Sequence, residues 1–192
     1  HARALLDRGA SRLIALDRDP AALAATRQTL AAFGERVELV HADYRELARV
    51  LDQRGLAVVS GVLADLGVSS MQLEAEGRGF SFRRDEPLDM RMDTTRGPTA
   101  ADLLAEVDEM DLANVIYRFG EERLSRRIAR ALVRARAERP LATTGQVADI
   151  VRRASRTKGF SRIDPATRTF QALRIWVNQE LEGLDAVLET AA

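Results

Sequence analysis

The chain has 192 residues, which suggests one domain, or one domain that carries an insertion. It contains no cysteine and two histidines, which excludes disulfides and thiolate metal sites and makes us expect no bound metal ion. No run of residues approaches the roughly 18 apolar residues that a membrane span requires, so we expect a cytoplasmic protein with no membrane partner.

The charge is balanced over the whole chain but unevenly distributed along it. There are 29 basic and 29 acidic residues, which gives a formal net charge of zero. Residues 1–114 hold 14 arginines against 20 acidic residues, whereas residues 115–174 hold 14 arginines and one lysine against five acidic residues. The basic segment suits a polyanionic partner such as RNA, with a solvated surface as the alternative.

The first 65 residues alternate between short apolar strands and helices. The Asp19-Pro20 pair provides an N-cap and a first-turn proline for the first of these helices. This alternation predicts parallel βαβ units and hence a doubly wound α/β sheet. The predicted strands are 12–17, 37–41 and 58–64, and the predicted helices are 20–33 and 44–54.

From residue 98 to residue 162 the pattern predicts helices only, so we interpret this block as an inserted subdomain. One predicted helix, 122–137, places Leu124, Ile128 and Leu132 on one face and arginines elsewhere. After Asp164 the spacing of apolar residues predicts one long helix. Its apolar stripe runs to Leu188, and we expect the stripe to pack back on the sheet. The predicted domains are therefore 1–97 with 163–192, and 98–162.

Polar residues follow each predicted strand, where ligands bind in open α/β sheets. Asp17 is placed to accept hydrogen bonds from ribose hydroxyls, and Tyr44 to stack on an adenine. Asp43 is suited either to bond the base amine or to cap its own helix. Asp65 is suited to hold a cofactor's ammonium group or to accept a proton from a substrate amine, with turn formation as the alternative.

The segment 64–93 is rich in Gly, Arg, Asp and Phe and has neither strand nor helix period. A long, chemically dense loop in a compact domain is usually functional. Its neutral donors and acceptors include Ser69, Ser70 and Gln72. Phe80 and Phe82 are suited to stack on a base or to anchor the loop in the core. Walker loops and serine triads are absent, which removes kinases and most serine hydrolases from consideration.

Five stretches resemble the ribosomal RNA small subunit methyltransferase H family. They are IALDRDP (14–20), DLGVSS (65–70), RGFSFRRDEPLDMRMD (78–93), YRFGEERLSRRIARAL (117–132) and PATRTFQALRIWVNQEL (165–181). The resemblance implies a class I methyltransferase fold with a helical insertion that recognises RNA. It also implies S-adenosylmethionine as cofactor and methylation of N4 of a decoding-centre cytidine in 16S rRNA.

The resemblance implies cofactor contacts by His1, Asp17, Tyr44, Asp65 and Gln72. His1 matches the last residue of a Gly-Gly-His turn, and the family's later Ser-Phe-His-Ser-Leu-Glu-Asp motif is absent, so we expect an internal fragment. Asp164 stands where the family usually has histidine, and Ala64 where it usually has leucine.

For the reaction itself, the expected catalytic residues are Asp65, Ser69 and Ser70. The expected partner is 16S rRNA or the small ribosomal subunit, and the oligomeric state is left open, with a dimer among the options. The expected phosphate contacts are Arg126, Arg127, Arg130, Arg134, Arg152, Arg153 and Lys158. The alternatives are an RNA-binding module without catalysis and a Rossmann-type dehydrogenase.

Overall fold

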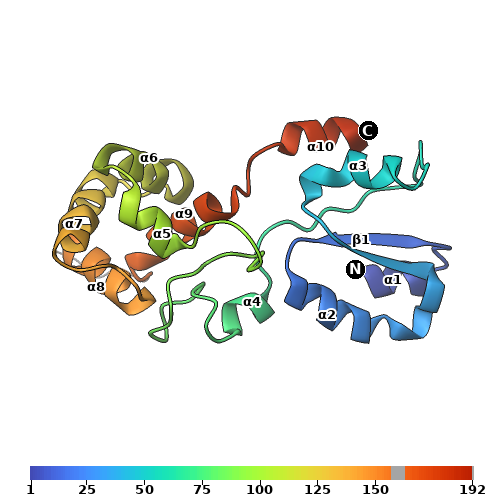
Figure 1. Ribbon diagram of the computed structural model, residues 1–192, viewed down its shortest axis with the longest axis horizontal. Helices are drawn as coiled ribbons and strands as arrows, with labels where there is room; N and C mark the ends of the chain where they lie inside the picture. Colours follow the sequence, from blue (N-terminus) through green and yellow to red (C-terminus); the bar gives the residue numbers. More distant parts are fainter. Residues whose placement is uncertain (157–162, 192) are drawn as a thin grey trace. The chain divides into compact units, whose positions relative to one another are not determined.

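The computed structural model describes residues 1–156 and 163–191, which form two compact units (Figure 1). The sheet unit consists of His1–Asp65, Met92–Thr95 and the C-terminal residues from Glu182 onward. The helical unit consists of Leu66–Arg91 and Arg96–Leu181. The division differs from the predicted domains, because Leu66–Arg91 and the helix after Asp164 group with the helical residues rather than with the sheet.

The sheet unit contains two parallel strands, β1 (Leu13–Asp17) and β2 (Val37–His41), as predicted for these residues. Asp19 caps the helix after β1, because its Oδ1 accepts a hydrogen bond from Ala21 N–H at 2.9 Å. Helix α2 (Pro20–Thr29) packs against both strands, and α10 (Leu184–Ala191) packs against α3 (Leu47–Asp52) (Figure 1). The other elements of this unit are α1 (Ala2–Asp7), η1 (Ala31–Arg36) and η2 (Tyr44–Glu46).

The predicted third strand, 58–64, is not a strand in the structure. No described residue pairs with its backbone in a ladder, and its apolar side chains are exposed, with Val58 84% and Leu63 57% accessible. An apolar run is compatible with a strand, but a strand forms only where a neighbour satisfies its backbone groups. The doubly wound sheet is therefore unconfirmed, and β1 and β2 make up a two-stranded parallel sheet among the described residues.

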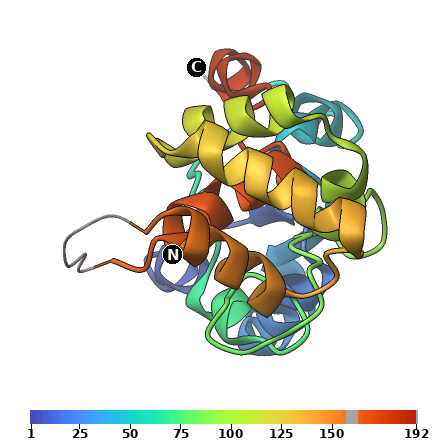
Figure 2. The ribbon, with the colours of Figure 1, turned by 90° about the vertical axis from the view of Figure 1, so that its left-hand side faces the viewer.

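The helical unit is built around α6 (Glu109–Gly120), which packs against α7 (Ser125–Glu138) and α9 (Ala166–Asn178). Figure 2 looks onto this unit, where α8 (Thr144–Ala154) packs against both α7 and α9. Within the described ranges no helix is both long and apolar enough to cross a membrane. The smaller helices are α4 (Ser70–Glu74) and α5 (Ala100–Glu106). The fully buried side chains of the core include Leu112, Ile116, Ile128, Leu132, Val147, Val151 and Leu173.

The single long helix predicted after Asp164 is wrong, because the chain divides into α9 and α10. Asn178 Nδ2 donates to the Met90 carbonyl at 2.7 Å and to the Arg174 carbonyl at 2.9 Å. The next residue, Gln179, has φ of 50°, a left-handed conformation that ends α9. The buried stripe of α9 packs against α6 within the helical unit, whereas α10, which carries Leu184 and Leu188, groups with the sheet unit.

Gly120, at the end of α6, allows α6 and α9 to approach closely. A Cβ atom added there would lie 2.4 Å from the Arg168 carbonyl oxygen and 3.2 Å from Ala172 Cβ. Alanine normally favours a helix over glycine, but here the clash with a backbone atom outweighs that preference. We expect Gly120→Ala to lower the free energy of unfolding by about 1–3 kcal/mol in chemical denaturation. Met110→Ala, an exposed change on the same helix, should stay within about 0.5 kcal/mol.

Candidate functional site

The carboxyl ends of the two strands bring Asp17 and His41 side by side. These residues are register partners in the parallel pair, so both end their strands at the same edge of the sheet. Asp17 Oδ1 accepts a hydrogen bond from Asp19 N–H at 2.8 Å. Burial nevertheless raises the pKa of the Asp17 carboxyl above its usual value, because desolvation outweighs that hydrogen bond. A half-buried carboxylate at this edge suits a ligand hydroxyl that would stabilise its charge.

Asp93 joins this edge and was missed by the sequence analysis. Its side chain is 2% exposed, and its Oδ2 lies 3.3 Å from His41 Nε2. Asp93 also accepts a hydrogen bond from Thr95 N–H at 3.0 Å, which holds the turn of Met92–Thr95. Acidic residues at the end of polar loops are commonly solvated, so the local sequence gave no indication that Asp93 is buried.

His1 and Asp65, two of the predicted cofactor residues, lie together in the sheet unit. His1 Nδ1 is 3.2 Å from Asp65 Oδ2, and the two side chains are 65% and 73% exposed. An ion pair this exposed contributes little to stability. The Asp65 carboxylate is therefore accessible to a ligand, although the predicted strand before it is absent.

Tyr44 is half-buried, and its hydroxyl donates to the Glu182 carbonyl oxygen at 2.8 Å. The neighbouring Asp43 caps η2, accepting from Arg45 N–H at 3.0 Å in a capping box with Glu46. Burial opposes ionisation of Asp43, but hydrogen bonds from Arg45 outweigh it, so the pKa of Asp43 lies below its usual value. Of the two predicted roles of Asp43, the helix cap is confirmed.

Ser69, Ser70 and Gln72 begin α4 in the helical unit. Ser69 Oγ accepts from Gln72 N–H at 3.2 Å, and Gln72 Oε1 accepts from Ser69 N–H at 2.9 Å. This capping box was not predicted, and it gives Ser69 and the buried Gln72 a structural role. Ser70 is exposed on the first turn of the helix. Asp65 belongs to the sheet unit, and these three residues belong to the helical unit.

The two phenylalanines of the 64–93 loop serve as anchors. Phe80 is 7% exposed, with the Arg78 guanidinium 5.5 Å from its ring centroid. Phe82 packs edge-on against Phe170 of α9, with ring centroids 4.7 Å apart. These contacts confirm the anchoring alternative for both rings.

Helix α7 carries a row of exposed arginines, as predicted for its outer face. Arg130 Nε lies 3.1 Å from Glu109 Oε1 of α6, in a pair exposed on both sides. Lys158, a further predicted phosphate contact, lies outside the described residues. The predicted phosphate contacts that form no ion pair with another described residue are Arg126, Arg127, Arg134 and Arg153.

Arg152 differs from the other predicted phosphate contacts because acidic residues already compensate its charge. Its Nη2 lies 2.8 Å from Asp164 Oδ2, and its Nη1 lies 3.1 Å from Asp149 Oδ1. The guanidinium also lies 5.6 Å from the Phe82 ring centroid. Hydrogen bonding to Asp164 raises the pKa of Arg152. Because these contacts hold the Arg152 guanidinium within the helical unit, we expect Arg152 to contribute less to phosphate binding than the other predicted contacts.

Arg152 and Arg153 provide a paired test of this assignment. We expect Arg152→Ala to destabilise the protein by about 1 kcal/mol, because it removes partly exposed ion pairs and a ring contact. Its affinity for rRNA should change little. Arg153→Ala should leave stability unchanged but lower the salt dependence of rRNA binding by about one phosphate contact. Denaturation and salt titrations measure both effects, and equal behaviour of the two variants would contradict the assignment.

The described residues contain no cluster of three or more histidine, aspartate or glutamate side chains suited to a metal ion. The two chemically distinctive features are the acidic edge of the sheet unit and the basic surface of the helical unit. The sheet unit offers Asp17, Tyr44 and the His1–Asp65 pair to a ligand. The helical unit offers exposed arginines on α7.

Known proteins are similar in sequence to this chain over its whole length. The model of the MraW methylase family matches residues 1–192. A ribosomal RNA small subunit methyltransferase H of Rhodopseudomonas palustris (strain TIE-1) is 52% identical over 191 residues, which cover 100% of this chain and 57% of that protein. A protein of the same name from Azoarcus sp. (strain BH72) is 54% identical over 98% of this chain and 60% of its own length. Another, from Sorangium cellulosum (strain So ce56), is 49% identical over 100% of this chain and 61% of its own length. The chain thus spans about three fifths of these relatives, and it belongs to the MraW methylase family.

Proposed function

We propose that this chain is part of an enzyme that transfers a methyl group from S-adenosylmethionine to N4 of a cytidine in the decoding centre of 16S rRNA. The observation that carries the proposal is the half-buried Asp17 carboxylate at the carboxyl end of β1. Ribose hydroxyls are bound by an acidic residue at this kind of strand end. The names of the relatives and the basic face of α7 support RNA as the substrate.

The described residues fit the cofactor in their chemistry. Asp17 would accept hydrogen bonds from the ribose, and the half-buried Tyr44 ring would contact the adenine. The exposed Asp65, with His1 beside it, would hold the ammonium group of the cofactor or a substrate amine. Gln72 is proposed as a further contact, although its side chain also completes the cap of α4. S-adenosylmethionine, when bound, supplies a methyl group on a sulfonium.

The chemical problem at the substrate is the weak nucleophilicity of an exocyclic amine whose lone pair is delocalised into the ring. Asp65 would accept an N–H hydrogen bond from that amine, which increases electron density on the nitrogen and orients it. Ser69 and Ser70 are exposed and would serve as neutral hydrogen-bond partners of the RNA.

Titration calorimetry of the full gene product distinguishes this function from a dehydrogenase. We expect binding of S-adenosylmethionine and no comparable binding of NAD, because the relatives are methyltransferases. The reverse preference would support the dehydrogenase. A protein that binds rRNA but neither ligand would support a binding module without catalysis.

A further inference from the structure

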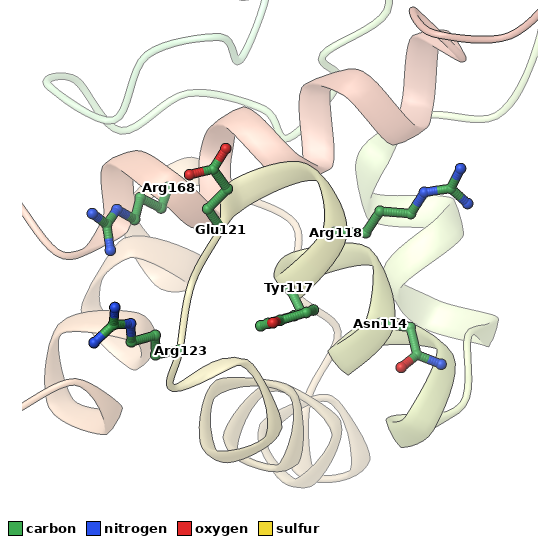
Figure 3. A pocket seen from close by; sticks show the side chains of 6 residues that line it. All are labelled: Asn114, Tyr117, Arg118, Glu121, Arg123 and Arg168. Carbon is green, nitrogen blue, oxygen red and sulfur yellow. The ribbon is translucent and has the colours of Figure 1, made fainter.

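The helical unit contains a pocket of about 1020 Å³ whose lining includes none of the predicted phosphate contacts on α7 (Figure 3). It opens where the end of α6, the turn that follows and the first turns of α9 meet. Its lining residues are Asn114, Tyr117, Arg118, Glu121, Arg123 and Arg168. In Figure 3 the Tyr117 ring extends into the middle of the opening, with Arg123 and Arg168 on one side and Arg118 and Asn114 on the other.

The close approach of α6 and α9 at Gly120 builds this pocket. A Cβ at Gly120 would lie 2.4 Å from the Arg168 carbonyl oxygen, so the two backbones touch at this point. Immediately afterwards Glu121 adopts φ of 51°, a left-handed conformation that ends α6 and redirects the chain toward Arg123. One sharp turn therefore places side chains from α6, the turn and α9 around Tyr117.

Tyr117 is unusual because its aromatic ring is on the surface. It is 63% exposed, whereas Ile116, the residue before it on α6, is completely buried and packs in the core. The ring of Tyr117 thus contributes little to the core. A rigid aromatic side chain on a basic surface is typical of a platform on which an unpaired nucleobase stacks.

The charge around the ring is positive and held in place. Arg168 Nη1 lies 3.9 Å from Glu122 Oε2, and the Arg118 guanidinium lies 5.5 Å from the Phe119 ring centroid. Three arginines and Glu121 line the pocket and sum to a charge of +2, which Glu122 beside Arg168 reduces to +1. Arg123 is exposed. Guanidinium groups bind phosphate oxygens with paired N–H donors, and any of the four bases can stack on an aromatic ring.

We propose that this pocket binds one unpaired nucleotide of the RNA substrate, distinct from the cytidine that is methylated. The base stacks on Tyr117, the Asn114 amide bonds its edge, and Arg123 and Arg168 contact the adjacent phosphate. The inference rests on the proposed function for the identity of the RNA. It adds a contact for a single-stranded segment, which a basic helix face alone does not provide.

The test measures RNA binding without cofactor, so it is independent of methyl transfer. The probe is a fluorescently labelled oligoribonucleotide of about ten nucleotides from the 16S decoding region, used single-stranded and annealed to its complement. We expect Tyr117→Ala to weaken single-strand binding by about 5- to 100-fold and duplex binding much less. Tyr117→Phe should retain most of the affinity because it keeps the stacking face. Met110→Ala is the matched control, an exposed apolar side chain on α6 outside the pocket.

The dependence of binding on salt separates the ring from the arginines. Arg123→Gln should lower the slope of log affinity against log salt by about one phosphate contact, whereas Tyr117→Ala should leave the slope unchanged. Unchanged melting temperatures would show that both variants are folded, as expected for exposed positions.

Equal single-strand affinities of Tyr117→Ala, Met110→Ala and the unaltered protein would overturn the inference, as would no binding of either probe. Such a result would leave the methyltransferase proposal in place if S-adenosylmethionine binds and methyl transfer occurs. A selective loss in Tyr117→Ala would support the pocket even if methyl transfer to this rRNA failed.

Discussion

Replacing Asp65 by alanine is expected to lower methyl transfer by about two to four orders of magnitude while leaving the protein folded. The side chain is 73% exposed and pairs with His1, which is 65% exposed, so its removal costs little stability. The Asp65 side chain contributes to function through the negative charge that it presents to a ligand. Initial rates of methyl transfer to small-subunit rRNA measure the effect in the full gene product.

Asp7→Ala is the matched control for Asp65→Ala. Asp7 is also an exposed carboxylate of the sheet unit in an exposed ion pair, with its Oδ2 3.6 Å from Arg3 Nε. We expect Asp7→Ala to retain full activity. A rise in the dissociation constant of S-adenosylmethionine in Asp65→Ala would place Asp65 on the cofactor, and a fall in turnover alone would place it on the amine. Retention of both affinity and turnover would refute a role for Asp65.

Asp17→Asn should separate cofactor binding from stability. Hydrogen bonds to a charged group contribute about 1.5–3 kcal/mol, so the loss of charge should weaken S-adenosylmethionine binding by about 10- to 150-fold. Without cofactor, however, the variant should be more stable than the unaltered protein at neutral pH. The amide oxygen of asparagine can still accept the hydrogen bond from Asp19 N–H, while the buried charge is gone.

The pH dependence of this stability difference follows from the raised pKa of Asp17. Below the unfolded-state pKa of about 3.9 the carboxyl is protonated in both states, so the two proteins should differ little. As the pH rises, the unfolded chain ionises more easily than the folded one, and the unaltered protein loses stability relative to Asp17→Asn. Melting temperatures across this pH range measure the difference. Equal cofactor affinity in the two proteins would contradict the assigned role of Asp17.

The local features of the fold were predictable from the sequence. The two strands, the Asp19 cap and the helix predicted at 122–137 (observed as α7) lie where short-range patterns placed them, because apolar period and capping side chains act within one or two turns. The third strand was not predictable in this way. Its formation depends on a hydrogen-bonded neighbour, and the apolar residues of 58–64 have none among the described residues.

Features that depend on contacts distant in sequence were missed for the same reason. Asn178 ends α9 by bonding Met90, which lies 88 residues earlier. Asp93 pairs with His41, and Asp164 pairs with Arg152. In the sequence Asp93 and Arg152 both looked like solvated charges, but Asp93 is buried and the charge of Arg152 is compensated. The Tyr117 pocket likewise depends on the approach of α9 to Gly120. In each case a residue type was visible in the sequence, but its partner was not.

The most direct test of the proposed function is to identify the methylated nucleoside. The full gene product is incubated with small ribosomal subunits that lack the modification and with S-adenosylmethionine labelled in its methyl group, and the 16S rRNA is digested to nucleosides for mass spectrometry. We predict label in N4-methylcytidine from the decoding centre, and its loss with Asp65→Ala but not with Asp7→Ala. Label in another nucleoside or another region of the rRNA, or no transfer by the unaltered protein, would contradict the proposal.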